Sequence, residues 1–330
     1  MTTAVANLRL RPYAGPDEVE GIVRIVNAGN RADGVDERWT VDGLRSWFEH
    51  PTATFDARRD AVVGELDGRM VAAGAVEWVD TRDGEFREYR FWGAVDPEVH
   101  GRGIGTALLA DHEHRARELA AEQRPDRRTV LGTFVPQGRS GEALLRAAGY
   151  DVARWFFEMV RPNLDEIELS PMPDGLEVRL VAPDQHPAIW RANREAFRDH
   201  WGGADESPEA MERFLADPDT DPSLWLIAWD RDEVAGGIWN EIFPEENAEL
   251  GIQRGWLGSV FTRRPWRGRG LASALIGRSL KLLRERRMTS GALGVDADNP
   301  TGALGLYEAA GFAVHDRSVA MRKGLEGVQS

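Results

Sequence analysis

The chain of 330 residues contains no cysteine. A disulfide framework, a thiolate metal site and a cysteine nucleophile are therefore excluded. The seven histidines are scattered, and His112 and His114, two residues apart on an expected helix, point in different directions. The sequence thus predicts no metal centre.

Long apolar segments and an excess of basic charge are also absent. The longest strongly apolar run, residues 224–229, is far shorter than the roughly 20 residues that span a bilayer, and the first residues lack the pattern of a signal peptide. The 41 basic residues against 55 acidic ones give a net charge of −14, which argues against a nucleic-acid backbone as the main partner. We therefore expect a cytoplasmic protein that binds neither membrane nor nucleic acid.

The chain repeats once along its length. The G-R-G segment ending at Gly103 recurs at Gly270, and A-G-Y ending at Tyr150 recurs as A-G-F ending at Phe312, at offsets of 167 and 162 residues. Two matches in one order at nearly equal offset indicate a duplicated globular domain, because the period is too long for a solenoid. A proline-rich stretch separates the halves. The sequence predicts domains at residues 1–162 and 177–330, joined by a linker at 163–176.

Both halves show the same order of expected elements, which is clearest in the second. Alternating apolar residues predict strands there, and wider apolar spacing predicts helices. The expected strands are residues 177–182, 224–229, 234–241, 254–262, 292–296 and 312–321, and the expected helices are residues 186–200, 207–216, 270–287 and 301–310. This mixture predicts an α/β fold with a mixed sheet covered by helices.

A glycine-rich turn stands between an expected strand and an expected helix of the second half. It reads R-G-R-G-L-A over residues 267–272. Glycine lets the backbone turn tightly, and the free amides and the dipole at a helix start suit a pyrophosphate. The turn is neither the dinucleotide pattern G-x-G-x-x-G nor a P-loop. Taken alone, it also fits an unliganded turn with solvated arginines.

A second motif begins 29 residues after Gly270 (299 − 270) and reads N-P-T-G-A-L-G-L-Y-E-A-A-G-F. Asn299 and Pro300 suit a helix start, and Tyr307 stands two turns further on the same face. Alone, these residues also fit a capped helix with a half-buried core tyrosine. Together, however, the Q/R-x-x-G-x-G/A turn and the A-x-x-x-Y-x-x-x-G-F order resemble the two signatures of the GNAT superfamily of N-acetyltransferases.

The resemblance implies two tandem GNAT domains, with acetyl-CoA as co-substrate and no metal. It implies that the turn amides hold the pyrophosphate of coenzyme A and that the preceding strand end and Asn299 contact its pantetheine arm. It also implies that Tyr307 gives a proton to the departing thiolate while the acetyl group passes directly to an amine of a small molecule. The cofactor-binding residues implied in the second half are Val260, Phe261, Thr262, Arg267, Gly268, Arg269, Gly270, Leu271, Ala272 and Asn299.

A base must remove the proton of the acceptor amine. Similar enzymes often carry a glutamate early on the strand before the turn, where this sequence has Trp256. Glu241, Glu249 and Asp296 are the other candidates, and each also fits an ordinary surface or strand-end carboxylate. Glu241 and Asp296 join Tyr307 as the expected catalytic residues.

The loop after the first helix of the second half contains a histidine, a tryptophan and two glycines. His200 and Trp201 stand near several acidic residues and are the expected acceptor-binding residues. The same side chains also fit a packed loop.

The first half keeps the turn as H-G-R-G-I-G over residues 100–105 but loses the second motif. Gln137 stands in the place of Asn299, and Leu145 in the place of Tyr307. Without a tyrosine to donate the proton, this half is expected to be catalytically silent. Any binding of coenzyme A there is expected at Val95, Gly101, Arg102, Gly103 and Gly105.

The tandem layout resembles that of mycothiol synthases, which acetylate the amine of a cysteinyl pseudodisaccharide. The sequence therefore predicts an acetyl-CoA-dependent N-acetyltransferase with its active site in the second half. Two alternatives stay open, an acetyltransferase for a protein amine and a non-catalytic acyl-CoA sensor. The presence of Tyr307 favours an enzyme, because a binding module does not need a proton donor.

Overall fold

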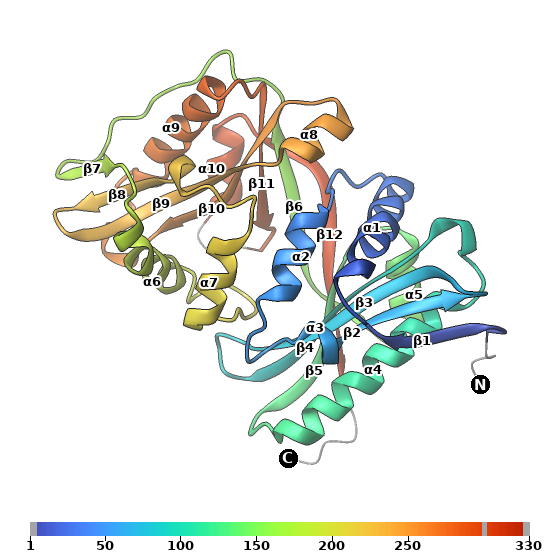
Figure 1. The fold of residues 1–330 in the computed structure, drawn as a ribbon. Helices are drawn as coiled ribbons and strands as arrows, with labels where there is room; N and C mark the ends of the chain where they lie inside the picture. Colours follow the sequence, from blue (N-terminus) through green and yellow to red (C-terminus); the bar gives the residue numbers. More distant parts are fainter. Residues whose placement is uncertain (1–4, 299–301, 326–330) are drawn as a thin grey trace. The chain divides into compact units, whose positions relative to one another are not determined.

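The computed structural model of the chain describes residues 5–298 and 302–325, which divide into two compact units (Figure 1). Of the described residues, the first unit contains 5–154, 201–213 and 318–325. The second contains 155–200 and 214–317, apart from the gap. Each unit has hydrophobic core clusters of its own.

In the first unit, one sheet is covered by helices on both faces. Its strand order is β1-β2-β3-β4-β5-β12, with β4 and β5 parallel and the other neighbours antiparallel. α1 and α2 pack on one face, and α4 packs on the other. The strands are β1 (Leu8–Pro12), β2 (Ala61–Leu66), β3 (Arg69–Asp80), β4 (Phe86–Val95), β5 (Arg128–Pro136) and the end of β12 (Ala313–Gly324), and the helices are α1 (Val19–Asp33), α2 (Val41–Glu49), α3 (Ala57–Asp60), α4 (Ile104–Gln123) and α5 (Ser140–Ala147).

The second unit repeats this arrangement, with the strand order β6-β11-β10-β9-β8-β7. α9 packs on one face of the sheet, and α6 packs on the opposite face (Figure 1). The strands are the end of β6 (Asp151–Arg161), β7 (Leu176–Arg179), β8 (Leu226–Asp230), β9 (Glu233–Ile242), β10 (Arg254–Thr262) and β11 (Ser290–Asp296), and the helices are α6 (His186–Ala196), the end of α7 (Pro208–Ala216), α8 (Pro244–Leu250), α9 (Leu271–Glu285) and α10 (Ala303–Ala309). The mixed α/β fold predicted from the sequence is confirmed.

The compact units do not follow the sequence halves at their last strands. Residues 156–161 of β6, from the first half of the chain, pair antiparallel with β11 of the second unit. Residues 318–324 of β12, from the second half, pair antiparallel with β5 of the first unit. Each half of the sequence therefore supplies the strand that completes the sheet of the other unit.

Local sequence explains most of the element boundaries. The backbone amide of Ala210 donates to the hydroxyl of Ser207 at 3.1 Å, so Ser207 caps α7 with Pro208 in the first turn, as the sequence predicts. α8 was not predicted, because its seven residues are mostly polar and show no apolar period. Among the described residues, no helix is both long enough and apolar enough to cross a membrane.

Candidate functional site

The glycine-rich turns of both units have the same backbone geometry. Gly270 precedes α9 with φ +84°, and Gly103 precedes α4 with φ +84°. Neither residue offers a side-chain acceptor, so the first amides of both helices have no side-chain cap. Free amides at the positive end of a helix dipole form an anion site, and the turns therefore fit a pyrophosphate.

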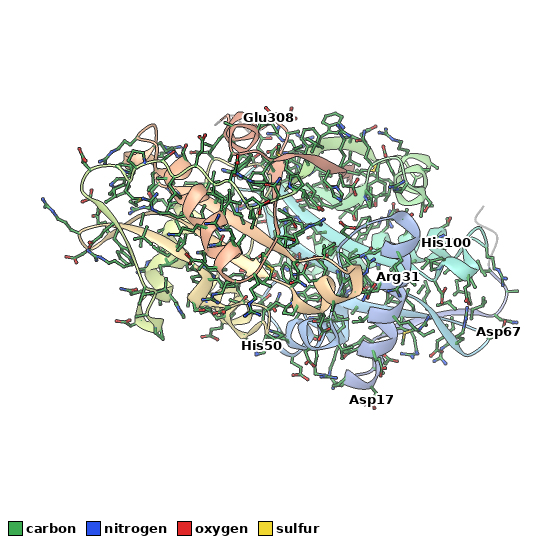
Figure 2. The ribbon with its side chains drawn as sticks, turned by 90° about the horizontal axis from the view of Figure 1, so that it is seen from above. Asp17, Arg31, His50, Asp67, His100 and Glu308 are labelled. Carbon is green, nitrogen blue, oxygen red and sulfur yellow. The ribbon has the colours of Figure 1, made fainter. Side chains whose placement is uncertain are left out.

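The arginines of the second turn mainly hold protein groups. Arg267 donates from Nε to the carbonyl of Thr262 at 3.0 Å and from a terminal nitrogen to the carbonyl of Ala196 at 2.9 Å. Arg269 donates to the carbonyl of Asp174 at 2.9 Å. His100, labelled in Figure 2, takes the place of Arg267 in the first unit, with Nε2 3.0 Å from the corresponding strand-end carbonyl of Val95. These side chains fasten the turns to backbone carbonyls of neighbouring segments and leave the backbone amides for a ligand.

The strand before the second turn separates from its parallel neighbour. β10 pairs with β11 only from Arg254 to Trp256, and the rest of β10 pairs with β9 alone. A β-bulge between Leu257 and Ser259 sets Gly258 out of register. The β11-facing edge of residues 257–262, which includes the expected Val260, Phe261 and Thr262, is thus open to an extended ligand such as a pantetheine arm.

Glu241 lies at this bulge. It pairs with Trp256 across the sheet, and its carboxylate lies so close to Gly258 that a Cβ there would overlap it. Burial raises the pKa of Glu241 to about 7, and the charges of Asp217 and Asp219 add to the rise. Among residues 5–298 and 302–325, no side chain or amide hydrogen-bonds to this carboxylate and no cation pairs with it. It can therefore take a proton from a ligand near neutral pH.

Tyr307 is on α10 in the core of the same unit. Its side chain is only 7% exposed, and burial raises its pKa to about 12. It belongs to the same apolar cluster as Leu257 and Val295, from the two strands that separate. The next residue, Glu308, is exposed (Figure 2). Asn299 lies outside the described residues.

The other expected site residues have ordinary contacts. Asp296 accepts the backbone amide of Asp298 at 3.0 Å, so it forms a turn after β11. Glu249 is exposed on α8. The His200 ring lies 4.3 Å from that of Phe197 in the second unit.

Trp201, the other expected acceptor residue, belongs to the first unit. The guanidinium of Arg322 lies 4.1 Å from its ring centroid, and the ring of Phe134 lies 6.5 Å away. Trp201 and His200 are therefore divided between the two units, although they are adjacent in sequence.

Strand registers allow the two units to be compared residue by residue. Val95 and Thr262 are the equivalent strand ends, and they pair with Ala72 and Gly236 on the third strand of their units. Five residues further along that strand are Glu77 in the first unit and Glu241 in the second, so these two glutamates correspond. Arg90 lies opposite Glu77, where the second unit has Trp256. Burial raises the pKa of Glu77, and the charges of Arg90 and Arg213 oppose that rise. The first unit therefore has the carboxylate, with the cations Arg90 and Arg213 and the acids Asp205 and Glu88 near it.

The strand opening also differs in the first unit. β3 and β4 pair without a bulge, and the hydroxyl of Thr133 on β5 donates to the carbonyl of Phe91 on β4 at 2.7 Å. This bond crosses the place where β4 and β5 separate. Leu145, in the position of Tyr307, is a buried apolar residue. The first unit thus keeps an opening between β4 and β5, which this bond crosses, but it lacks the bulge and the tyrosine.

Two polar residues of the second unit were not selected from the sequence. Asn193 on α6 is 2% exposed and donates from Nδ2 to the hydroxyl of Ser259 on β10 at 2.7 Å. Ser259 follows the bulged Gly258 directly. A glycine within an expected strand is a sequence signal for a bulge, but no sequence pattern joins residues 193 and 259.

Comparisons with known proteins agree with this geometry. The Acetyltransferase (GNAT) family matches residues 26–127 and 187–312, once in each half. The mycothiol acetyltransferase of Geodermatophilus obscurus is 29% identical over 317 residues, covering 93% of this chain and 95% of that protein. The mycothiol acetyltransferase of Streptomyces avermitilis is 30% identical over 324 residues, covering 93% of this chain and 92% of that protein.

Solved structures extend the similarity to the whole architecture. A GCN5-related N-acetyltransferase from Sphaerobacter thermophilus has a TM-score of 0.72 and 26% identity, and 98% of each chain is covered. A tandem GNAT protein from the clavulanic acid biosynthesis pathway has a TM-score of 0.70 and 19% identity, with 97% of this chain and 99% of that chain covered. The second of these shows the shared tandem fold.

Proposed function

Because the chain belongs to the GNAT family of acetyltransferases and is on that ground an N-acetyltransferase, we propose that its second half carries the reaction. Acetyl-CoA is the co-substrate that the family uses. The open edge of β10 and the free amides before α9 fit its pantetheine arm and pyrophosphate. The proposed cofactor residues are Val260, Phe261, Thr262, Arg267, Gly268, Arg269, Gly270, Leu271, Ala272 and Asn299.

The unpaired carboxylate of Glu241 at the bulge carries this proposal. A half-buried carboxylate with a pKa of about 7 and no counter-ion is suited to take the proton of an amine. As the amine nitrogen bonds to the acetyl carbon and the carbon–sulfur bond breaks, Glu241 accepts the amine proton and Tyr307 protonates the sulfur. Asp296 forms a turn, so we assign the base to Glu241.

We assign a structural role to the first half. Its turn keeps Gly101 and Gly103, so an anion could still bind the amides there, together with Val95, Arg102 and Gly105. Turnover needs more than this turn. The first half has Leu145 in the position of Tyr307 and Arg90 in the position of Trp256, and a Thr133 hydrogen bond crosses its strand opening. We propose residues 1–162 and 177–330, with the linker 163–176, as the duplicated units of sequence.

We propose a small primary amine as the acceptor, with deacetylated mycothiol as the leading candidate. Two relatives named mycothiol acetyltransferase that match nearly the whole chain support this choice. Asp217 and Asp219 place negative charge near Glu241, which favours a cationic amine. His200 and Trp201 remain proposed acceptor residues.

The test measures thiol release from acetyl-CoA with a panel of amines that includes deacetylated mycothiol. We expect turnover with a small amine and a fall in kcat of about 10- to 100-fold for Tyr307→Phe, because the proton donor is lost. Leu145→Ala is the matched change in the first half, and it should leave kcat unchanged in folded protein. Binding of acetyl-CoA without turnover on any amine would contradict the proposal, and so would full activity of Tyr307→Phe.

A further inference from the structure

A buried polar pair joins α6 to the strand that carries the bulge. The side-chain amide of Asn193 donates to the hydroxyl oxygen of Ser259 at 2.7 Å. Asn193 is 2% exposed, and a buried amide is costly unless it is hydrogen-bonded. Ser259 has no other side-chain partner among the residues that the structure describes. The bond therefore sets the position of a hydroxyl whose own proton and second lone pair are unused.

The strand registers place this hydroxyl on the same face of the sheet as Glu241. Ser259 pairs with Trp239, and Trp256 pairs with Glu241. Cross-strand partners point to the same face of a sheet, so Ser259 shares the face of Trp239. Residues two apart on a strand also share a face, so Trp239 and Glu241 point to the same side. Ser259 and Glu241 consequently flank Gly258 on the α6 side of the sheet.

From this geometry we propose that Ser259 binds the nitrogen of the acceptor amine, held in place by Asn193 as a positioning residue. This inference rests on the proposed function and adds to it a residue that selects the acceptor. The free lone pair of Ser259 Oγ accepts one N–H of the primary amine, and Glu241 takes the proton that the amine gives up. Two groups on either side of the bulge thus fix the nitrogen for attack.

The first unit supplies an internal contrast. Trp92 pairs with Ala75 three residues before the Val95 pair, so it takes the position of Ser259. On α1, Asn27 instead exchanges hydrogen bonds with the backbone of Trp39, at 2.9 and 2.8 Å. An asparagine is therefore present on the first helix of both units, but it holds a loop in one and a hydroxyl at the bulge in the other.

The test compares Ser259→Ala and Ser259→Thr, assayed with acetyl-CoA and the best amine of the panel. We expect Ser259→Ala to lower kcat/KM for the amine about tenfold and to leave the KM for acetyl-CoA unchanged, because one neutral hydrogen bond to the acceptor is lost. Ser259→Thr keeps the hydroxyl and should retain kcat/KM within about twofold. Asn193→Ala should also lower kcat/KM for the amine. Combining it with Ser259→Ala should lower kcat/KM no further than Ser259→Ala alone.

Asn27→Ala is the control for loss of a buried helix asparagine, and it should lower the melting temperature without changing kcat/KM. Wild-type kcat/KM for Ser259→Ala would overturn the inference, and so would equal losses in Ser259→Ala and Ser259→Thr, or an effect confined to the KM for acetyl-CoA. If Asn193→Ala does not fold, the two Ser259 variants still decide the question. A wild-type protein that turns over no amine would contradict the proposed function itself, which separates the two failures.

Discussion

Glu241 and Glu77 occupy the same position on the third strand of their units, and their neighbours make them different chemically. The cations Arg90 and Arg213 oppose the rise in the pKa of Glu77, to which Asp205 and Glu88 add. Near Glu241, Asp217 and Asp219 add to the rise in its pKa. Like charges and burial both favour the neutral acid, so Glu241 titrates close to neutral pH. A base is most effective when its pKa lies near the working pH.

The activity of Glu241→Gln tests this assignment. We expect a fall in kcat/KM of about 10²–10³-fold at pH 7, because glutamine cannot accept the amine proton. In the wild type, kcat/KM should rise as pH passes about 7, since the carboxylate must be ionised to act. The variant should keep only the rise that comes from the amine itself. Glu245→Gln, on the exposed side of α8, controls for loss of a carboxylate.

The contribution of Glu241 to wild-type stability should fall with rising pH, whereas its contribution to activity should rise. The folded protein holds the Glu241 proton more tightly than the unfolded chain, because the pKa is raised from 4.5 to about 7. Wild-type stability from this group is therefore complete below about pH 4.5 and falls as pH rises through 7. Glutamine does not ionise. Denaturant unfolding should show Glu241→Gln gaining up to about 3 kcal/mol relative to wild type between pH 4.5 and pH 8. A difference that does not change with pH would contradict the burial of this carboxylate.

At the scale of elements, the strand openings of the two units differ by one inserted residue. Gly258 adds a bulge to β10, and β4 has none. A bulge bends its strand and re-aims the side chains beside it, here Ser259. A Cβ at Gly258 would overlap the Glu241 carboxylate, which would have to move. The bulge, the carboxylate and the open edge therefore occur together in one unit.

The two glycine-rich turns offer a matched pair of substitutions. Gly270 and Gly103 both adopt φ +84°, where an alanine is strained by roughly 1–2 kcal/mol. Gly270→Ala and Gly103→Ala should therefore lower the free energy of unfolding by similar amounts. Only Gly270→Ala should raise the KM for acetyl-CoA, by about tenfold, because it shifts amides of the proposed active turn. Steady-state kinetics on both variants check this, and a larger kinetic effect at Gly103 would place the active site in the first unit.

At the scale of the whole molecule, the last strands of the halves are exchanged between the units. β5 of the first unit pairs with residues 318–324, and β11 of the second pairs with residues 156–161. Without these segments each sheet would expose a long strand edge with unpaired amides and carbonyls. Each unit of the duplication therefore depends on a strand that the other half of the chain supplies.

Separate production of residues 1–162 and 163–330 tests this dependence. Each piece alone should fail to give a cooperative unfolding transition, because one sheet lacks its completing strand. Produced together, the pieces should form a complex near the 36.7 kDa of the intact chain and recover thiol release. Circular dichroism melts and size-exclusion chromatography measure both outcomes. Independent cooperative folding of either piece would show that the exchange is dispensable.

Sequence patterns predicted the elements that have strong local signals. β10 begins and ends where the alternation predicted, and the Ser207 cap of α7 and the turn at Gly270 are local features. α8 carried no apolar period and was not predicted. Glu241 could be named only as one of several carboxylates, because its raised pKa depends on burial in the fold and on the charges of aspartates outside its strand.

The sequence by itself determined the duplication, the mixed α/β class, the two turns and the loss of the tyrosine at Leu145, because each is written in residues close together in the chain or repeated in order along it. Only the tertiary structure decided which unit each closing strand completes, which charges lie near each of the two equivalent glutamates, and which residue Asn193 holds. These depend on strand pairing and burial between residues far apart in the chain, as in the pairing of β5 with β12 and the bond from Asn193 to Ser259, 66 positions apart. Such contacts form only when the chain folds, since the free energy of a buried charge or amide is set by its neighbours in space.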